Sequence, residues 1–190
     1  MAHEVWQTRR MLERIGTLAL LAGCIFVTVP ASAADKVVSP VTKKNWHNHP
    51  AIVDIRKLFQ GNEAELKAGN FVTKELPACE LPSRQMERTA FVDAQGRIRK
   101  FVVDGGSDDS AYRLEHHYDE KGRLRFAFGR TGAVNDTTVE HRLYYSEDGK
   151  LLWHDRKQQG PGYPFLMDWP RKYVVRDAAK ELGVQPDCRD

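Results

Sequence analysis

A seven-residue pattern occurs three times between residues 92 and 151, and this repetition constrains the fold more strongly than any other feature. The pattern is an apolar residue, Asp or Ser, two variable residues, Gly, Arg or Lys, and a second apolar residue. Its glycines, Gly96, Gly122 and Gly149, are 26 and 27 residues apart. Glycine suits the left-handed position of a tight turn, and Asp or Ser accepts hydrogen bonds from the turn backbone. Each copy therefore predicts a β-hairpin. The copies, called turn units below, span residues 92–98, 118–124 and 145–151.

The segments beside the turn units alternate between apolar and polar residues, which is the pattern of strands with one buried face. Leu124, Phe126 and Phe128 are expected on one face, with Arg123 and Arg125 on the other. Three such hairpins predict about six strands in an antiparallel meander, and the apolar face of this sheet needs a cover. The same alternation places four residues of the preceding strand on one face: Tyr112, Leu114, His116 and Tyr118.

An amphipathic helix over residues 50–68 is the expected cover. Ile52, Ile55 and Phe59 follow a helical period, and Pro50 suits the first helical position. A short helix is expected near residues 171–182 and adds to the same cover.

The rest of the chain is expected to connect or precede these elements. Residues 70–88 contain Pro77 and Pro82 and are predicted to be a connector. The sequence thus predicts a single globular α+β domain over residues 49–190, with an extended or mobile lead-in over residues 34–48.

The turn units resemble those of the YD-type and MORN-type repeat proteins. The resemblance covers about 60 residues and rests on the three short turns. The units lack the Gly and aromatic signature of a complete MORN repeat. The resemblance implies a meander of hairpins and carries no implication for function.

The N-terminal residues have the organisation of a secretory signal peptide. Three arginines among the first 14 residues precede an uncharged apolar stretch, and Pro30 precedes an Ala-Ser-Ala sequence that ends at Ala33. We expect residues 1–33 to be removed by cleavage after Ala33. Two alternatives are an uncleaved membrane anchor and a lipoprotein, because the Leu-Ala-Gly-Cys sequence ending at Cys24 matches a bacterial lipobox. All three place the remaining chain in the periplasm, on the envelope or outside the cell.

Two cysteines remain beyond the leader. Cys79 lies in a loop-like segment, and Cys188 lies close to the C-terminus. Because exported proteins meet an oxidising environment, we predict a disulfide between Cys79 and Cys188. A reactive thiol or a metal ligand is the alternative.

The histidines are the main candidates for a metal-binding or catalytic site. His47 and His49 lie on one side of an extended segment and are weak candidates for metal ligands, with a helix-capping role as the favoured alternative. Four more histidines, on predicted strands, suggest a metal or acid–base cluster, against which we favour ordinary filling of amphipathic strands. They are His116, His117, His141 and His154.

Basic residues recur near the turns and suggest a surface for an anionic partner. Arg97, Arg123 and Arg125 are the main candidates for this binding surface. The favoured alternative is a solvated face in which acidic residues neutralise these arginines across strands. Those acidic residues are Glu115, Glu140 and Glu147.

A second candidate binding element is the segment over residues 160–170, which is rich in aromatic residues, Gly and Pro. Tyr163, Phe165 and Trp169 could form an ordered recognition loop, because such side chains contribute binding energy at low entropic cost. The alternative is a loop that packs Phe165 and Trp169 into the core.

These features favour an exported envelope protein with a non-catalytic binding role. The net charge of +3 is too small for a dedicated nucleic-acid binder. The sequence contains no nucleophile elbow, zincin, Walker or dinucleotide-binding motif, so we expect no cofactor. The expected partner is an envelope protein or a ligand, and the membrane is involved only through the leader or a lipid on Cys24. The alternatives are a hydrolase that uses the strand histidines and a purely structural envelope protein or lipoprotein.

Overall fold

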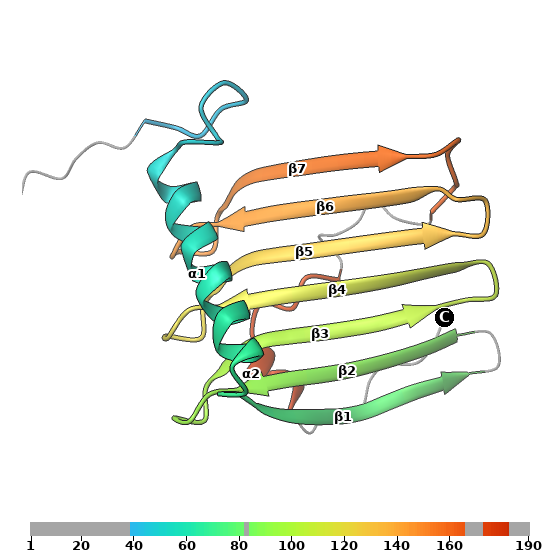
Figure 1. Cartoon of the computed structure of the whole chain (residues 1–190), viewed down its shortest axis with the longest axis horizontal. Coiled ribbons are helices and arrows are strands. Elements are labelled where there is room, and N and C mark those ends of the chain that lie inside the picture. Colours follow the sequence, from blue (N-terminus) through green and yellow to red (C-terminus); the bar gives the residue numbers. More distant parts are fainter. Residues whose placement is uncertain (1–38, 82–83, 166–172, 183–190) are drawn as a thin grey trace, which may run out of the picture. The chain divides into compact units, whose positions relative to one another are not determined.

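A computed structural model of the chain describes residues 39–81, 84–165 and 173–182 (Figure 1). The seven strands form one antiparallel sheet in the order β1-β2-β3-β4-β5-β6-β7, so every strand pairs with its sequence neighbour. The meander and the α+β class are confirmed, and the sheet has seven strands where six were expected. The elements are α1 (Pro50–Lys67), β1 (Val72–Leu81), β2 (Arg84–Val92), β3 (Ile98–Gly106), β4 (Ser110–Tyr118), β5 (Leu124–Ala133), β6 (Thr138–Tyr145), β7 (Leu151–Gln159) and α2 (Ala178–Glu181).

The additional strand is β1, and the connector predicted over residues 70–88 was therefore wrong. Pro77 argued against a strand because proline cannot donate to a sheet ladder. The register between β1 and β2 shifts between Leu76 and Cys79, which leaves Pro77 in an irregular stretch of an edge strand. Proline is tolerated at such positions because no partner needs its missing N–H group.

Each turn unit is followed by the same irregularity of the sheet. Glycines at φ +78°, +73° and +80° close the three turns, as predicted. In each hairpin the strand after the turn then carries one extra residue that has no partner opposite it, which is a β-bulge. The extra residues are Arg99, Arg125 and Leu152.

The bulges turn the side chains that follow them to the other face of the sheet. Leu124 precedes the bulge at Arg125 and packs in the larger core cluster with Tyr118. Phe126 follows the bulge and packs with Ile52 and Ile55 of α1. The prediction that Leu124 and Phe126 share a face was therefore wrong, and both faces of the sheet are partly apolar.

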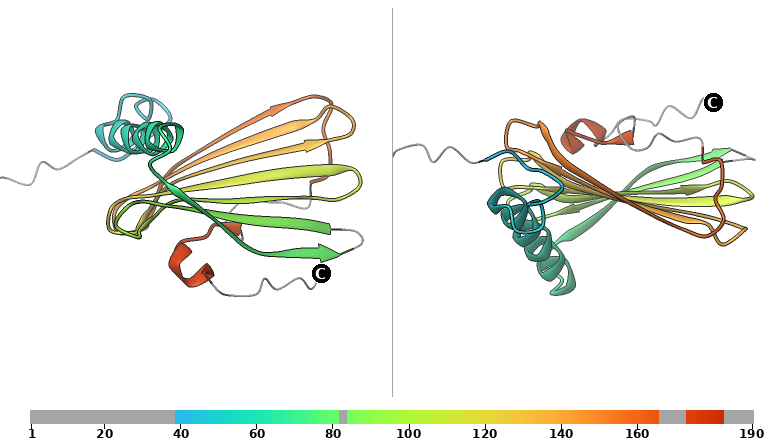
Figure 2. Two further views of the ribbon diagram at one scale, coloured as in Figure 1. Left: turned by 60° about the horizontal axis from the view of Figure 1, so that its bottom comes forward. Right: turned by 90° about the horizontal axis from the view of Figure 1, so that it is seen from above.

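The two apolar faces have different covers (Figure 2). Helix α1 confirms the predicted helix and packs on β4, β5 and β6 near the turn units. The face that carries Leu114 and Tyr118 is covered instead by the segment that contains Val175 and Ala178. We expected both helices on one face, and the bulges explain why the sheet needs a cover on each of its two faces.

No helix among the described residues is long and apolar enough to cross a membrane.

Candidate functional site

The turn units hold their acidic residues in a dense set of hydrogen bonds. In the middle unit, the carboxylate of Asp119 accepts hydrogen bonds from the backbone N–H groups of Lys121 and Arg123 at 2.9 and 3.0 Å. The Arg123 guanidinium adds an ion pair at 2.7 Å. Burial alone would raise the pKa of Asp119, but these hydrogen bonds from Arg123 and Lys121 outweigh it and lower the pKa. The first unit repeats the arrangement with Asp93 and Arg97.

The arginines in the bulges link neighbouring turn units to each other. Arg99 Nε lies 3.4 Å from the carbonyl oxygen of Tyr118 in the second unit. Arg125 Nε lies 3.1 Å from the carbonyl oxygen of Tyr145 in the third. In the third unit the corresponding residue is Leu152, which packs in the cluster beneath α1. No arginine at this position therefore extends these contacts beyond the third unit.

The predicted basic binding residues are engaged within the protein. Arg97 pairs with Asp93 at 2.8 Å, and Arg123 also pairs with Glu147 at 2.7 Å. Arg125 lies 3.6 Å from Glu147. Glu147 thus neutralises Arg123 and Arg125 across strands, as expected, whereas Arg97 pairs with Asp93 of its own turn unit. Binding of an anionic partner through these arginines stays a prediction.

A charged cluster lies between α1 and the sheet. The ammonium of Lys100 is 2.6 Å from Glu63 of α1 and 2.7 Å from Glu115 of β4, and the side chain of Lys100 is only 5% exposed. His117 Nε2 lies 3.9 and 3.8 Å from the same two carboxylates. Both ring nitrogens of His117 are buried, and neither has a hydrogen-bond partner among the described residues.

The charges in this cluster control the ionisation of its members. Burial alone would raise the pKa of Glu115, but the neighbouring Lys100 and Arg113 outweigh burial and hold the pKa well below its usual range. Burial lowers the pKa of His117, and the positive charge of Lys100 acts in the same direction. At neutral pH the carboxylate of Glu115 is therefore ionised and the imidazole of His117 is neutral.

The predicted cluster of strand histidines does not form as a single group. His117 faces α1, whereas the adjacent His116 faces the opposite side of the sheet and contacts the carbonyl of Phe101 at 3.2 Å. Burial lowers the pKa of His116 to about 4. His141 and His154 do come together, with a ring nitrogen of each 2.8 Å apart.

The lead-in histidines have structural roles in the described chain. His49 caps α1, because its Nδ1 accepts a hydrogen bond from the N–H of Ala51 at 3.3 Å. Its Nε2 donates to the carbonyl of Ser39 at 2.7 Å. With both ring nitrogens engaged, His49 has no lone pair free for a metal ion. His47 instead packs against the ring of Trp46, at 3.8 Å between centroids.

The aromatic segment is attached to loops at the other end of the strands. The Tyr163 hydroxyl donates to the carboxylate of Asp109, which lowers the pKa of Asp109. The rings of Tyr163 and Phe165 lie 4.7 Å apart between centroids. Trp169 lies outside the described residues. The recognition hypothesis therefore stays a prediction.

The cysteine and leader predictions also fall largely outside the described residues. Cys79 lies in β1, while Cys24, Cys188 and the whole of residues 1–33 lie outside the described part. The disulfide and the processing of the leader therefore stay predictions.

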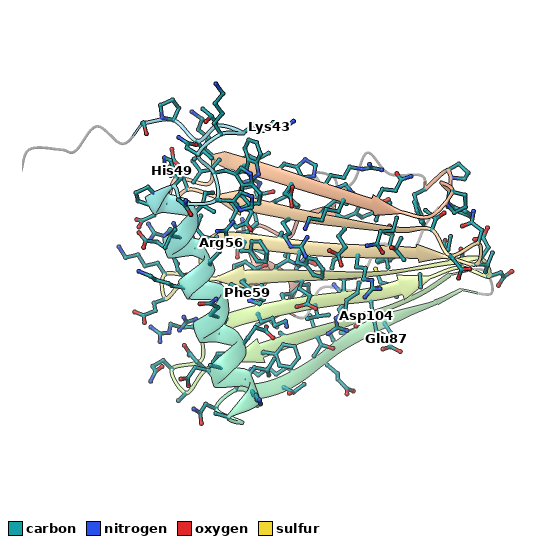
Figure 3. The ribbon with its side chains drawn as sticks, turned by 45° about the horizontal axis from the view of Figure 1, so that its top comes forward. Lys43, His49, Arg56, Phe59, Glu87 and Asp104 are labelled. Carbon is teal, nitrogen blue, oxygen red and sulfur yellow. The ribbon has the colours of Figure 1, made fainter. Side chains whose placement is uncertain are left out.

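Six charged residues form one row across the sheet, which was not predicted from the sequence. They lie directly opposite one another on six successive strands, from β2 to β7. The row lies on the α1 face, since Arg113 and His117 belong to the same alternation of β4. Figure 3 shows Glu87 and Asp104 away from α1. The members of this charged row are Glu87, Asp104, Arg113, Arg130, Glu140 and Lys157.

The charges in the row do not alternate regularly. Glu87 lies opposite Asp104, and Arg113 lies opposite Arg130, so two of the neighbouring pairs carry like charges. Like charges directly opposite each other destabilise a sheet. Arg113 and Asp104 form an ion pair at 2.7 Å, but within the described part of the chain neither Glu87 nor Arg130 has an ion pair within 4 Å.

Comparisons with known proteins add no further evidence about this site. No family model matches the chain, and neither a curated protein nor a solved structure is significantly similar to it.

Proposed function

We propose that this chain is an exported, non-catalytic binding protein of the bacterial envelope, and that its partner docks on the charged row. The organisation of the leader supports export. The charged row supports the binding surface, because two of its neighbouring pairs are like-charged, and neither Glu87 nor Arg130 has an ion pair among the described residues that would offset the repulsion. Natural proteins give up stability most often where a surface serves a function.

The like-charged neighbours are the observation that carries the proposal. A sheet surface selected only for solubility would alternate its charges, since each opposite pair contributes roughly 0.2–1 kcal/mol and each like pair costs a similar amount. The row instead groups two carboxylates, Glu87 and Asp104, and then two guanidinium groups, Arg113 and Arg130. A partner that brings the opposite charge to each group relieves both repulsions.

This grouping also defines the chemistry of the partner. The α1 face of β1, β2 and β3 carries the acidic residues Glu75, Glu87 and Asp104 in the region beyond α1. On β5 the row continues with Arg130, and Lys157 follows on β7. The complementary surface is that of a protein with basic residues over β2 and β3 and acidic residues over β4 and β5.

Cross-linking in living cells tests the binding surface. A photo-reactive amino acid is placed at Lys157 or at Arg156, which are adjacent, exposed residues of β7 on opposite faces of the sheet. We expect a protease-sensitive adduct from position 157 and none from position 156. Charge reversal by Arg130→Glu is expected to abolish that adduct.

Two results would reject this surface. One is an equal adduct from both positions, and the other is an adduct from position 157 that Arg130→Glu leaves unchanged. A phosphatase that is active only outside the cytoplasm, fused to the C-terminus, tests export separately: an inactive fusion contradicts the envelope assignment and leaves the test of the charged row valid.

A further inference from the structure

We propose that Glu63, Glu115 and His117 form a binding site for a divalent transition-metal ion such as Zn²⁺. One ligand atom from each residue lies within 4.8 Å of the others. An ion bound at about 2 Å from each ligand brings such atoms roughly 3–4 Å apart, so small side-chain movements complete the site. One imidazole and two carboxylates are ligand types that Zn²⁺ accepts.

His117 is the observation that separates this site from an ordinary acidic cluster. Its side chain is fully buried, and its ring nitrogens have no hydrogen-bond partner among the described residues, although Nε2 lies 3.8 Å from Glu115 and 3.9 Å from Glu63. A buried polar group without a partner is costly, and it calls for an explanation. Coordination by Nε2 supplies the missing partner.

Lys100 is the competing cation in the same place. Its ammonium lies 2.6 Å from Glu63 and 2.7 Å from Glu115, so it balances the two carboxylates when no metal ion is bound. No hydrogen bond joins it to His117 within the described chain. A metal ion satisfies the carboxylates and the imidazole together, at the cost of repelling Lys100. We therefore expect Lys100 to weaken metal binding.

The site is accessible to an ion from solvent, and a bound ion would connect α1 to the sheet. The side chain of Glu63 is 37% exposed, so the cluster reaches solvent beside α1. Glu63 belongs to α1, whereas Glu115 and His117 belong to β4. A bound ion therefore ties the helix to the sheet, and it stabilises the folded chain because the unfolded chain does not hold these ligands together.

Equilibrium dialysis of the chelator-treated protein against Zn²⁺ tests the site, and the absorption of bound Co²⁺ reports its ligands. We expect binding of the ion by the wild-type chain together with a higher melting temperature. Glu63→Gln should weaken binding by about tenfold or more, since even groups that only support a metal ligand contribute 10–100-fold. Lys100→Met should strengthen it. His116→Gln is the matched control, because His116 is equally buried but faces the other side of the sheet.

Three outcomes would overturn the proposal. The first is a wild-type chain that binds no Zn²⁺ at micromolar concentrations. The second is an affinity that Glu63→Gln leaves unchanged, which would place the ion at other residues, such as the pair His141 and His154. The third is binding that appears only in Lys100→Met, which would make Lys100 the permanent cation of this cluster. His117→Gln should also weaken binding, but it changes a fully buried side chain; Glu63 is partly exposed, so Glu63→Gln keeps the test valid even where His117→Gln fails to fold.

Discussion

The middle turn unit gives the most specific prediction about stability. Asp119→Ala removes a side chain that is only 11% exposed and that accepts backbone hydrogen bonds from Lys121 and Arg123. Hydrogen bonds to a charged group contribute roughly 1.5–3 kcal/mol each, but water replaces part of this loss at the exposed N–H groups of a turn. We expect Asp119→Ala to lower the free energy of unfolding by about 2–4 kcal/mol.

The third turn unit provides a control in the same molecule. Ser146 occupies the equivalent position, is uncharged, and accepts one backbone hydrogen bond, from Lys150 at 3.0 Å. Ser146→Ala should therefore cost only about 0.5–1.5 kcal/mol in urea unfolding at pH 7. The pKa of Asp119 is lower in the folded chain, so its contribution is complete above the unfolded pKa of about 3.9 and disappears as the pH falls through the folded value. Equal costs for the two variants, or a cost of Asp119→Ala that stays the same at strongly acidic pH, would refute this reasoning.

Three further predictions concern the core and the C-terminal segment. Asn62→Ala should lower the free energy of unfolding by about 2–3 kcal/mol, because the buried Asn62 amide donates to the backbone carbonyls of Arg99, at the first bulge, and Tyr118, in the second turn unit, at 3.0 and 3.2 Å; urea titration measures this. The pKa of His116 falls from 6.5 to about 4 on folding, so the unfolded chain takes up this proton first. Stability on the order of 3 kcal/mol is lost as the pH falls through that range, and melting curves of His116→Gln should show a weaker pH dependence. Non-reducing peptide mapping of the exported protein should find Cys79 linked to Cys188, and two free thiols would reject the disulfide.

The repeated turns made most of the fold predictable. Their sequence specifies local geometry, since the glycines and the Asp or Ser side chains determine each turn without help from the rest of the chain. The bulges were not predictable from alternation alone, because an extra residue changes the face of every side chain after it. Arg99 and Arg125 follow their turns at the same spacing, and this regularity is the signal that could have indicated a common irregularity.

The edge strand and the candidate sites depend on tertiary structure. Proline is incompatible with a central strand but is tolerated in an irregular edge strand such as the one that contains Pro77. The sequence alone does not identify the edge strand. The charged cluster around Lys100 forms only because α1 packs on the sheet and brings Glu63 next to β3 and β4. No local sequence pattern specifies this packing. The charged row could have been found by counting outward from the turns, but only once the bulges had fixed the register.

The proposed docking surface is tested most directly by Glu87→Lys. This substitution places Lys opposite Asp104 and replaces a like-charged pair with an opposite pair. We expect the melting temperature to rise by about 1–3 °C, because an opposite pair contributes up to roughly 1 kcal/mol. The cross-linked adduct from position 157 should disappear in the same variant. A lower melting temperature together with an undiminished adduct would contradict the proposal that the charged row is a docking surface whose like-charged pairs lower the stability of the sheet.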